Sequence, residues 1–147
     1  MDINVKQVDV SEREYVEIGY HEQDRRVNEI IRFVKGLDGS VAGVREGKQY
    51  EIPVVDIMYF ESVDNRTFIY TAKMSYETSR KLYEFESELQ DSNFLRISKS
   101  VVLNIMKVES IRPALNGRFL CKLRNGEEVI ISRKYVGAFR EYISRKV

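Results

Sequence analysis

The first third of the chain carries two apolar patterns that predict a strand followed by a helix. Three apolar residues alternate with polar residues or glycine, as in a short strand: Val16, Ile18 and Tyr20. Over residues 22–35 the apolar positions have the spacing of one helix face: Val27, Ile30, Ile31 and Val34. Gly36 and Gly39 follow, as is typical where a helix ends. This strand–helix segment is too small to bury a core alone, so its apolar face is expected to pack on something else.

The next stretch predicts two strands joined by a turn. Residues 50–61 are rich in apolar and aromatic side chains, and Pro53 interrupts them at an expected edge or bend. Asp64 and Asn65 predict a turn, because both residue types adopt left-handed backbone conformations at low cost. The β-branched and aromatic residues over 67–74 predict the returning strand.

A second helix is expected over residues 79–90. Ser79 is a suitable N-cap, and three apolar residues fall on one face: Leu82, Phe85 and Leu89. The other sides carry three glutamates, expected to lie in solvent and to add only solubility: Glu84, Glu86 and Glu88.

The last third predicts short strands separated by strong turn signals. Asn116-Gly117 and Asn125-Gly126 are typical of β-hairpins. The expected strands cover 96–105, 107–112, 119–123 and 128–131. Aromatic residues spaced by four and three positions over 134–143 predict one or two helical turns at the end. The chain as a whole is expected to be mainly β, with two clear helices.

The net charge of +1 conceals a strong asymmetry along the chain. Residues 94–147 hold 12 Lys/Arg against four Asp/Glu, a balance of +8. Residues 1–46 and 47–93 have balances of −3 and −4. A basic third of this kind is expected of a protein that binds a polyanion such as DNA or RNA, although a basic surface that only faces solvent would give the same count.

Most catalytic and metal-binding classes lack the residues they need. Cys121 is the only cysteine, so no internal disulfide can form, and a buried thiol in a reducing compartment is expected. His21 is the only histidine and is expected to be exposed, which argues against a His-based triad or metal site. Neither a phosphate-binding glycine loop nor an apolar run of membrane-spanning length is visible. We therefore expect a cytoplasmic protein that is not an enzyme and has no cofactor, no metal and no small-molecule substrate.

Polar or basic residues interrupt the apolar pattern at three turns. Ser98, Lys99 and Ser100 break one strand pattern, and Ser132-Arg133-Lys134 follows another directly. Asp64-Asn65-Arg66 occupies the earlier turn. Lys and Arg can bind guanine, Asn can pair with adenine and Ser can donate to phosphate, so these turns are candidates for DNA contact. Composition alone does not distinguish them from ordinary solvent-exposed loops.

The order of several short motifs resembles that of the LytTR DNA-binding domain family. Ile57–Ser62 is similar to an early hydrophobic–aromatic–Glu segment, and Phe94–Asn104 to the central signature Phe-x-Arg-x-x-x-Ser followed by an apolar pair and Asn. Three later landmarks follow in the family's order: Asn116-Gly117-Arg118, Asn125-Gly126-Glu127 and Ile131-Ser132-Arg133-Lys134-Tyr135. Each motif is short, but together they cover about residues 47–143.

The resemblance implies a fold and a division of the chain. It implies a mainly β domain over residues 47–147, with elongated antiparallel sheets and one small helix between them. Residues 1–46 are then a separate strand–helix segment for oligomerisation or regulator contact. They are too few for a receiver domain, so the chain resembles the stand-alone regulators of this family.

The resemblance also implies that loops, rather than a recognition helix, read successive major grooves of DNA. The family's base-reading positions fall here on Lys99 and Arg133, with Ser98 and Lys134 beside them. A third contact falls on Asn65 or Arg66. Two other motif residues are expected to support the loops: Asn104 and Tyr135. Lys146, near the C-terminus, is expected to play no part in base reading.

Two functions from different classes follow. The first is a sequence-specific transcriptional regulator that binds promoter DNA as a homodimer and is controlled by a co-encoded membrane protein. The second is an interaction protein with the same fold that has lost DNA reading and sequesters a partner. Lys99 and Arg133 stand in the expected loops, which favours the first.

Overall fold

The computed structural model describes residues 1–37 and 39–144. Three α-helices lie in this part of the chain: α1 (Arg25–Leu37), α2 (Leu82–Glu88) and α3 (Arg133–Ser144). The strands are β1 (Ser40–Arg45), β2 (Lys48–Pro53), β3 (Ile57–Val63), β4 (Arg66–Thr71), β5 (Ser75–Thr78), β6 (Phe94–Arg96), β7 (Val101–Asn104), β8 (Val108–Pro113), β9 (Phe119–Leu123) and β10 (Glu128–Ile131). Short 3₁₀ helices are η1 (Val54–Asp56), η2 (Gln90–Ser92), η3 (Ile105–Lys107) and η4 (Leu115–Gly117).

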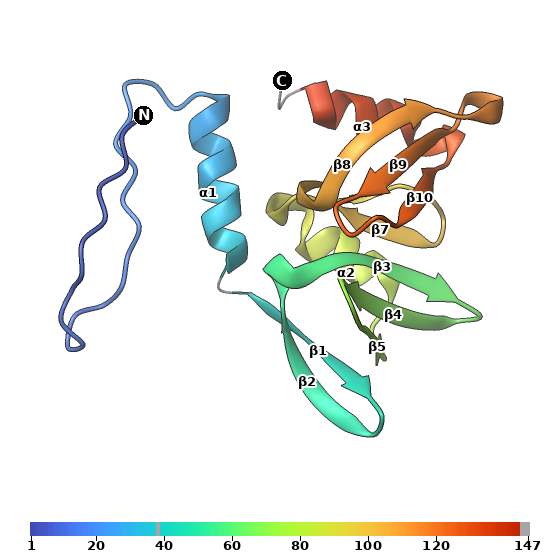
Figure 1. Cartoon of the computed structure of the whole chain (residues 1–147), viewed down its shortest axis with the longest axis horizontal. Coiled ribbons are helices and arrows are strands. Elements are labelled where there is room, and N and C mark those ends of the chain that lie inside the picture. The colour runs from blue at the N-terminus through green and yellow to red at the C-terminus, as the bar shows by residue number, and fades with distance from the viewer. Residues whose placement is uncertain (38, 145–147) are drawn as a thin grey trace.

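The described strands form two antiparallel sheets (Figure 1). The larger has seven strands in the order β2-β1-β5-β4-β3-β7-β6, and the smaller has three in the order β10-β9-β8. This confirms the expected mainly β fold of antiparallel sheets with small helices. Pro53 ends the edge strand β2, where the missing N–H of proline interrupts no pairing to a further strand.

Each face of the larger sheet carries a core. On one face α2 packs Leu82 and Phe85 against β3, and the Phe85 ring stacks on Phe60 with centroids 4.0 Å apart. On the other face the smaller sheet and α3 pack together, with Cys121 and Phe139 fully buried. Successive residues of β7 alternate between the two cores, as the pleat of a strand requires.

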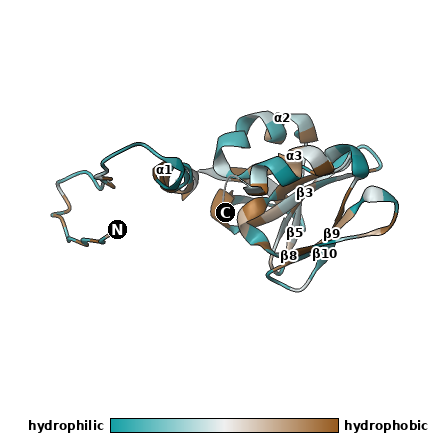
Figure 2. Cartoon of the chain, turned by 90° about the horizontal axis from the view of Figure 1, so that it is seen from above, coloured by the Kyte–Doolittle hydropathy of each residue, from teal (hydrophilic) through white to brown (hydrophobic). Residues whose placement is uncertain are grey.

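The N-terminal helix is confirmed, but the strand before it is not. Residues 16–20 contain no strand, because their alternating side chains find no neighbouring strand in the described chain. Figures 1 and 2 show residues 1–24 extending away from the sheets, beside α1. Val27 of α1 is buried against the body, and the rest of the predicted apolar face is half-buried: Ile30, Ile31 and Val34.

Several boundaries differ from the sequence expectation. The strand expected over 96–105 is two strands, β6 and β7, which reverse direction at residues 97–100. Helix α2 begins at Leu82 rather than near Ser79, because the Glu84 carboxylate accepts a hydrogen bond from the Lys81 N–H and caps the helix there. The C-terminal helical turns are the longer helix α3.

Strand β1 joins the first segment of the chain to the sheet. It forms a six-residue antiparallel register with β2 and also pairs with β5. Val41 of β1 is buried in the same core as Phe60. A domain boundary after residue 46 would therefore separate the two strands of the β1–β2 hairpin.

Candidate nucleic-acid interface

Four turns meet at one end of the two sheets, and we call residues 63–66, 97–100, 114–118 and 131–134 the loop end (Figure 1). The Ser62 N–H donates to the Ser100 carbonyl at 2.8 Å, which joins the first two turns. The Ser132 N–H donates to the Ile97 carbonyl at 2.9 Å, which joins the second to the fourth. Helix α1, η1, η2 and η3 lie at the opposite end of the strands, which we call the helix end (Figure 1).

The turn that carries Lys99 is held by one arginine side chain. Arg96 Nε donates to the Ser98 carbonyl at 2.7 Å, and its Nη2 donates to the Lys99 carbonyl. The remaining nitrogen, Nη1, lies 3.0 Å from Glu86 Oε1 on α2. One guanidinium therefore fixes two consecutive carbonyls of the turn and ties it to a helix.

Within this turn the two predicted residues have different tasks. The Ser98 hydroxyl accepts a hydrogen bond from the Ser100 N–H at 3.2 Å and lies 3.4 Å from the Ser100 hydroxyl. Ser98 therefore shapes the turn. The Lys99 side chain is exposed and pairs with no carboxylate among the described residues.

Arg133 and Lys134 are the first two residues of α3 and are both exposed. Gly117 lies directly beside Arg133: a Cβ on this glycine would be 2.9 Å from Arg133 Cδ. The aliphatic part of Arg133 thus lies against the neighbouring hairpin, and a larger residue at position 117 would have to displace it. The Lys134 ammonium lies 5.7 Å from the centroid of the Tyr135 ring, a cation–π geometry.

The Asn65–Arg66 turn is confirmed as a turn, but its arginine is engaged. Asn65 has a φ of 63°, the left-handed conformation expected of it. Arg66 Nε lies 3.1 Å from Glu77 Oε2, its Nη2 binds the other carboxylate oxygen, and its Cζ lies 5.3 Å from the Phe68 ring centroid. The hydrogen bonds from Arg66 lower the pKa of Glu77. Arg66 is therefore part of the β4–β5 surface.

Arg66 is paired with Glu77, but most of the other positive charge at the loop end is not neutralised by carboxylates among the described residues. Five basic residues on or beside its turns form no ion pair with Asp or Glu among the described residues: Lys99, Arg112, Arg118, Arg133 and Lys134. The Arg118 Nε donates instead to the Leu115 carbonyl at 3.0 Å, which closes its own turn. The loop end can therefore offer cations to an anionic partner without first breaking an ion pair.

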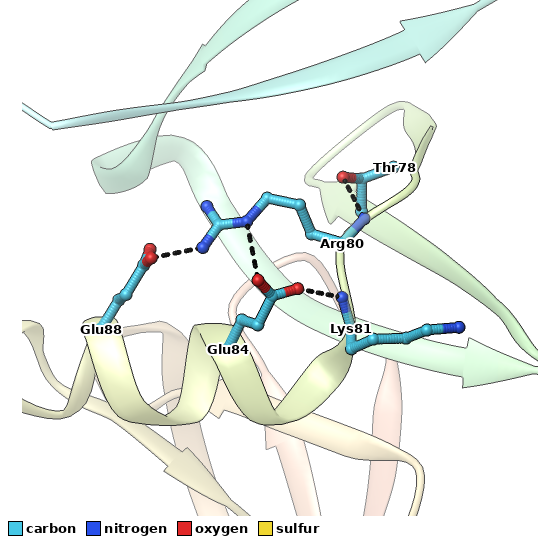
Figure 3. Close-up of polar contacts among 5 residues, drawn as sticks. All are labelled: Thr78, Arg80, Lys81, Glu84 and Glu88. Carbon is cyan, nitrogen blue, oxygen red and sulfur yellow. Dashed lines mark hydrogen bonds and ion pairs between the residues drawn. The ribbon is translucent and has the colours of Figure 1, made fainter.

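The glutamates of α2 are paired, which corrects the expectation that they only face solvent. Figure 3 shows Arg80 between Glu84 and Glu88, with its Nε 3.9 Å from the Glu84 carboxylate and its Nη2 bonded to Glu88. Glu86 binds Arg96. Arg96 was not predicted as a site residue, although it stands in the Phe-x-Arg signature, because a sequence pattern does not show which carbonyls a guanidinium will reach.

The remaining sequence expectations concern supporting and excluded residues. Asn104 is buried; its Nδ2 donates to the Ile57 carbonyl at 2.9 Å and its Oδ1 accepts from the Met106 N–H at 3.0 Å, as expected of a structural residue. His21 is exposed, and burial raises the pKa of the Cys121 thiol to about 12. No cluster of His, Cys, Asp or Glu suited to a metal occurs in the described parts of the chain. Lys146 lies outside them.

Residues 47–144, two-thirds of the chain and all of the loop end, match the LytTr DNA-binding domain family. The chain belongs to this family. A solved LytTr DNA-binding domain of a Bacillus cereus response regulator aligns with a TM-score of 0.69 and 26% identity, covering 72% of this chain and 97% of that domain. Family membership agrees with the expectation of a non-enzymatic protein.

Two groups of relatives differ in how much of their own length this chain spans. The transcriptional regulatory protein YpdB of Escherichia coli K12 is 33% identical over 99 residues, and this chain spans about two-fifths (41%) of its length. The HTH-type transcriptional regulator SAS2254 of Staphylococcus aureus is 27% identical over 144 residues, which are 97% of this chain and 95% of its own length. The name of that relative refers to a helix-turn-helix, but in the described chain strands separate each α-helix from the next. No described helix is long and apolar enough to cross a membrane.

Proposed function

We propose that this chain is a sequence-specific transcriptional regulator that reads successive major grooves of double-stranded DNA with the loop end. Lys99 and Arg133 are the base-reading residues, Asn65 supplies a third contact, and Lys134 binds phosphate. Ser98 and Arg66 support the turns. The observation that carries the proposal is the Arg96-held turn, which presents the exposed Lys99 beside the turn of Arg133, with no carboxylate bound to either.

Preorganisation of their turns favours Lys99 and Arg133 as base-reading residues. A long cationic side chain loses conformational entropy when it binds a base, and a fixed backbone limits the further loss from ordering the turn. The aliphatic part of the Arg133 side chain also lies against Gly117, which limits the directions that this side chain can take. Arginine can bind guanine O6 and N7 with two hydrogen bonds, worth about 1–3 kcal/mol of discrimination against other bases.

The test is a titration of the full chain against duplex DNA. The operator is first selected from random duplexes, and binding is then measured against that operator and a scrambled duplex at several salt concentrations. We expect selective binding whose log–log salt slope is about −4 to −5 per subunit, as for roughly 4–6 neutralised phosphates. Equal affinity for both duplexes, or a slope near zero, would contradict the proposal.

A second proposal concerns residues 1–24, which favour contact with another protein. Their exposed apolar side chains include Ile3 (89%), Val5 (88%) and Val10 (102%). Apolar side chains left uncovered along an extended segment are typical of an interaction site. We propose that this segment joins two copies into the homodimer that binds DNA. A co-encoded membrane regulator, or another partner that the chain sequesters, is the competing occupant.

Sedimentation of an Ile3→Glu/Val5→Glu double variant tests the dimer. Both side chains are exposed, so the monomer should remain folded while the dimer is lost. A wild-type chain that sediments as a monomer, or a variant that still forms the dimer, would contradict this assignment. Ile30→Glu is the comparison, because Ile30 is half-buried against the body and its substitution should lower stability instead.

The DNA-binding module itself is proposed to begin near Gly39 rather than at residue 47. Deleting residues 1–46 would remove β1, leave β2 without a partner strand and take Val41 out of the core. A fragment of residues 39–147 should therefore fold and bind the operator, whereas 47–147 should be less stable. Circular dichroism melts and operator titration of both fragments check the boundary. Equal melting temperatures of the two fragments would instead place the start of the DNA-binding module at residue 47.

A further inference from the structure

A cleft at the helix end, far from the loop end, separates α1 from the body of the domain. Its cavity has a volume of about 190 Å³. Helix α1 supplies one wall, and η1, η2, β6, β7, η3 and the residue after β9 supply the others. The lining residues used below are Arg32, Phe33, Phe94, Met106, Lys107 and Arg124. Typical pockets for drug-sized ligands measure about 300–1,000 Å³, so an occupant of this cleft must be small.

The floor of the cleft is apolar. Val54 and Phe94 are buried there, and Phe33 and Met106 stand partly exposed on opposite sides. Asn104 also lines the cleft, but its amide is occupied by the Ile57 carbonyl and the Met106 N–H. The floor therefore favours the hydrocarbon part of a ligand.

The rim of the cleft is cationic. Arg32, Lys107 and Arg124 line it, and no Asp or Glu among residues 1–37 and 39–144 does. None of the three pairs with a carboxylate among the described residues, and Arg124 Nε is held by the Met106 carbonyl at 3.2 Å. Three basic residues therefore line a small apolar cavity, and none of them is bound to a carboxylate of the described chain, although Arg32 also lines a neighbouring pocket together with Asp24 and Glu29.

We propose that this cleft binds a small organic anion with an apolar body, of the medium-chain carboxylate class. The hydrocarbon part would lie on Phe94 and Met106, and the carboxylate would face Lys107 and Arg124 from the body and Arg32 from α1. Such a ligand bridges α1 and the domain and therefore stabilises their contact. The site shares no residue with the proposed DNA-reading surface, so either can fail without the other.

Methionine-methyl NMR of the full chain tests the proposal directly. The chain has four methionines, and only Met106 lines the cleft. Titration with sodium octanoate should shift the Met106 methyl signal saturably. Met58, which is buried in the other core, and Met74, which is 49% exposed, should not move, and so serve as references for unfolding and for adsorption to exposed surface.

Matched ligands and variants separate recognition of the ligand's negative charge from nonspecific hydrophobic binding. Octylamine and acetate, which lack the negative charge and the apolar body respectively, should leave Met106 nearly unmoved at the same concentrations. Lys107→Gln/Arg124→Gln should weaken octanoate binding by at least about tenfold, the effect of losing roughly 1.4 kcal/mol of binding energy. Lys48→Gln, on the exposed strand β2, should not change it.

The outcomes that overturn the proposal are distinct. A non-saturable shift, or equal shifts at Met74 and Met106, indicates surface adsorption. Equal binding of octanoate and octylamine, or full octanoate affinity in the Lys107→Gln/Arg124→Gln variant, removes the role of the cationic rim. No shift of Met106 at all would exclude a carboxylate ligand and leave the rim to an acidic protein segment.

Discussion

The Lys99 turn and the Asn65–Arg66 turn lie side by side at the loop end. They differ in whether the basic side chain of the turn is already bound within the chain. At the first, a neighbouring arginine binds the backbone, and the cation of the turn stays free. At the second, the arginine of the turn binds a carboxylate of its own sheet and lies over Phe68. We therefore propose that a basic residue in a turn is not sufficient for a DNA contact, and that it also matters whether another group already holds the backbone of the turn.

The largest expected effect comes from removing the group that holds the Lys99 turn. Arg96→Ala deletes hydrogen bonds to two turn carbonyls and the ion pair with Glu86, so operator binding should weaken by roughly 2–3 kcal/mol. Arg80→Ala is the matched control, because it also breaks an arginine–glutamate pairing on α2 but touches neither carbonyl. Operator titration of both variants, with melting curves, makes the test. Equal losses in the two variants would mean that Arg96 acts only through stability.

Next in size is the loss of the proposed base readers themselves. Arg133→Ala should weaken operator binding by about 1–3 kcal/mol and leave binding to a scrambled duplex nearly unchanged. Lys99→Ala should behave in the same way at a different base position. Both variants are titrated against operator and scrambled duplex at one salt concentration. If both affinities fall by the same factor, the residue is a phosphate anchor and not a reader of sequence.

Because Gly117 lies against the Arg133 side chain, substitution of this glycine is expected to weaken operator binding by an intermediate amount. Gly117→Ala should cost about 1–2 kcal/mol of stability, because φ is +73°, and should also displace the Arg133 stem and weaken operator binding. Gly47→Ala has the same backbone penalty, at φ +76°, but a Cβ there meets no atom within 4 Å. Only the first variant should therefore lose DNA affinity. Equal operator affinity in the two would show that Arg133 does not depend on its contact with Gly117.

The smallest effect is expected at Arg66. Arg66→Ala removes an exposed ion pair with Glu77, a kind of pair that adds little to stability, and no proposed base contact. Its operator affinity should stay within about threefold of wild type, a difference below 1 kcal/mol. A loss as large as that of Arg133→Ala would show that Arg66 leaves Glu77 for DNA, and the contrast between the two turns would then be wrong.

Much of the fold follows from local sequence. The spacing of Val27 and its companions predicts α1, and the left-handed preference of Asp64, Asn65 and Asn116 predicts two of the turns, all confirmed. Burial of Cys121 follows from its apolar strand. These features depend on residues within a few positions of each other, which is the range over which a single sequence is informative.

The sequence is less informative where contacts between residues far apart in the chain determine the local structure. Residues 16–20 have a strand pattern, but a strand needs a neighbour, and the described chain offers none. The strand expected over 96–105 is divided because Arg96 binds its own following turn and a glutamate on α2. Arg66 is a candidate through the family resemblance, and its ion pair with Glu77 on β5, a strand that was not predicted, is likewise a contact that the sequence does not show. In each case the sequence shows the residue type, and the tertiary contact sets its task.

The single cysteine of the chain can also serve as a reporter of local opening. Cys121 lies between the smaller sheet, α3 and the larger sheet, has no exposed surface, and its thiol has a pKa of about 12. Reagents that attack thiolates therefore react only after the two sheets separate. The rate of labelling in the intact chain measures how often this junction opens, with no substitution needed to install the reporter. A duplex bound across turns from both sheets should lower that rate.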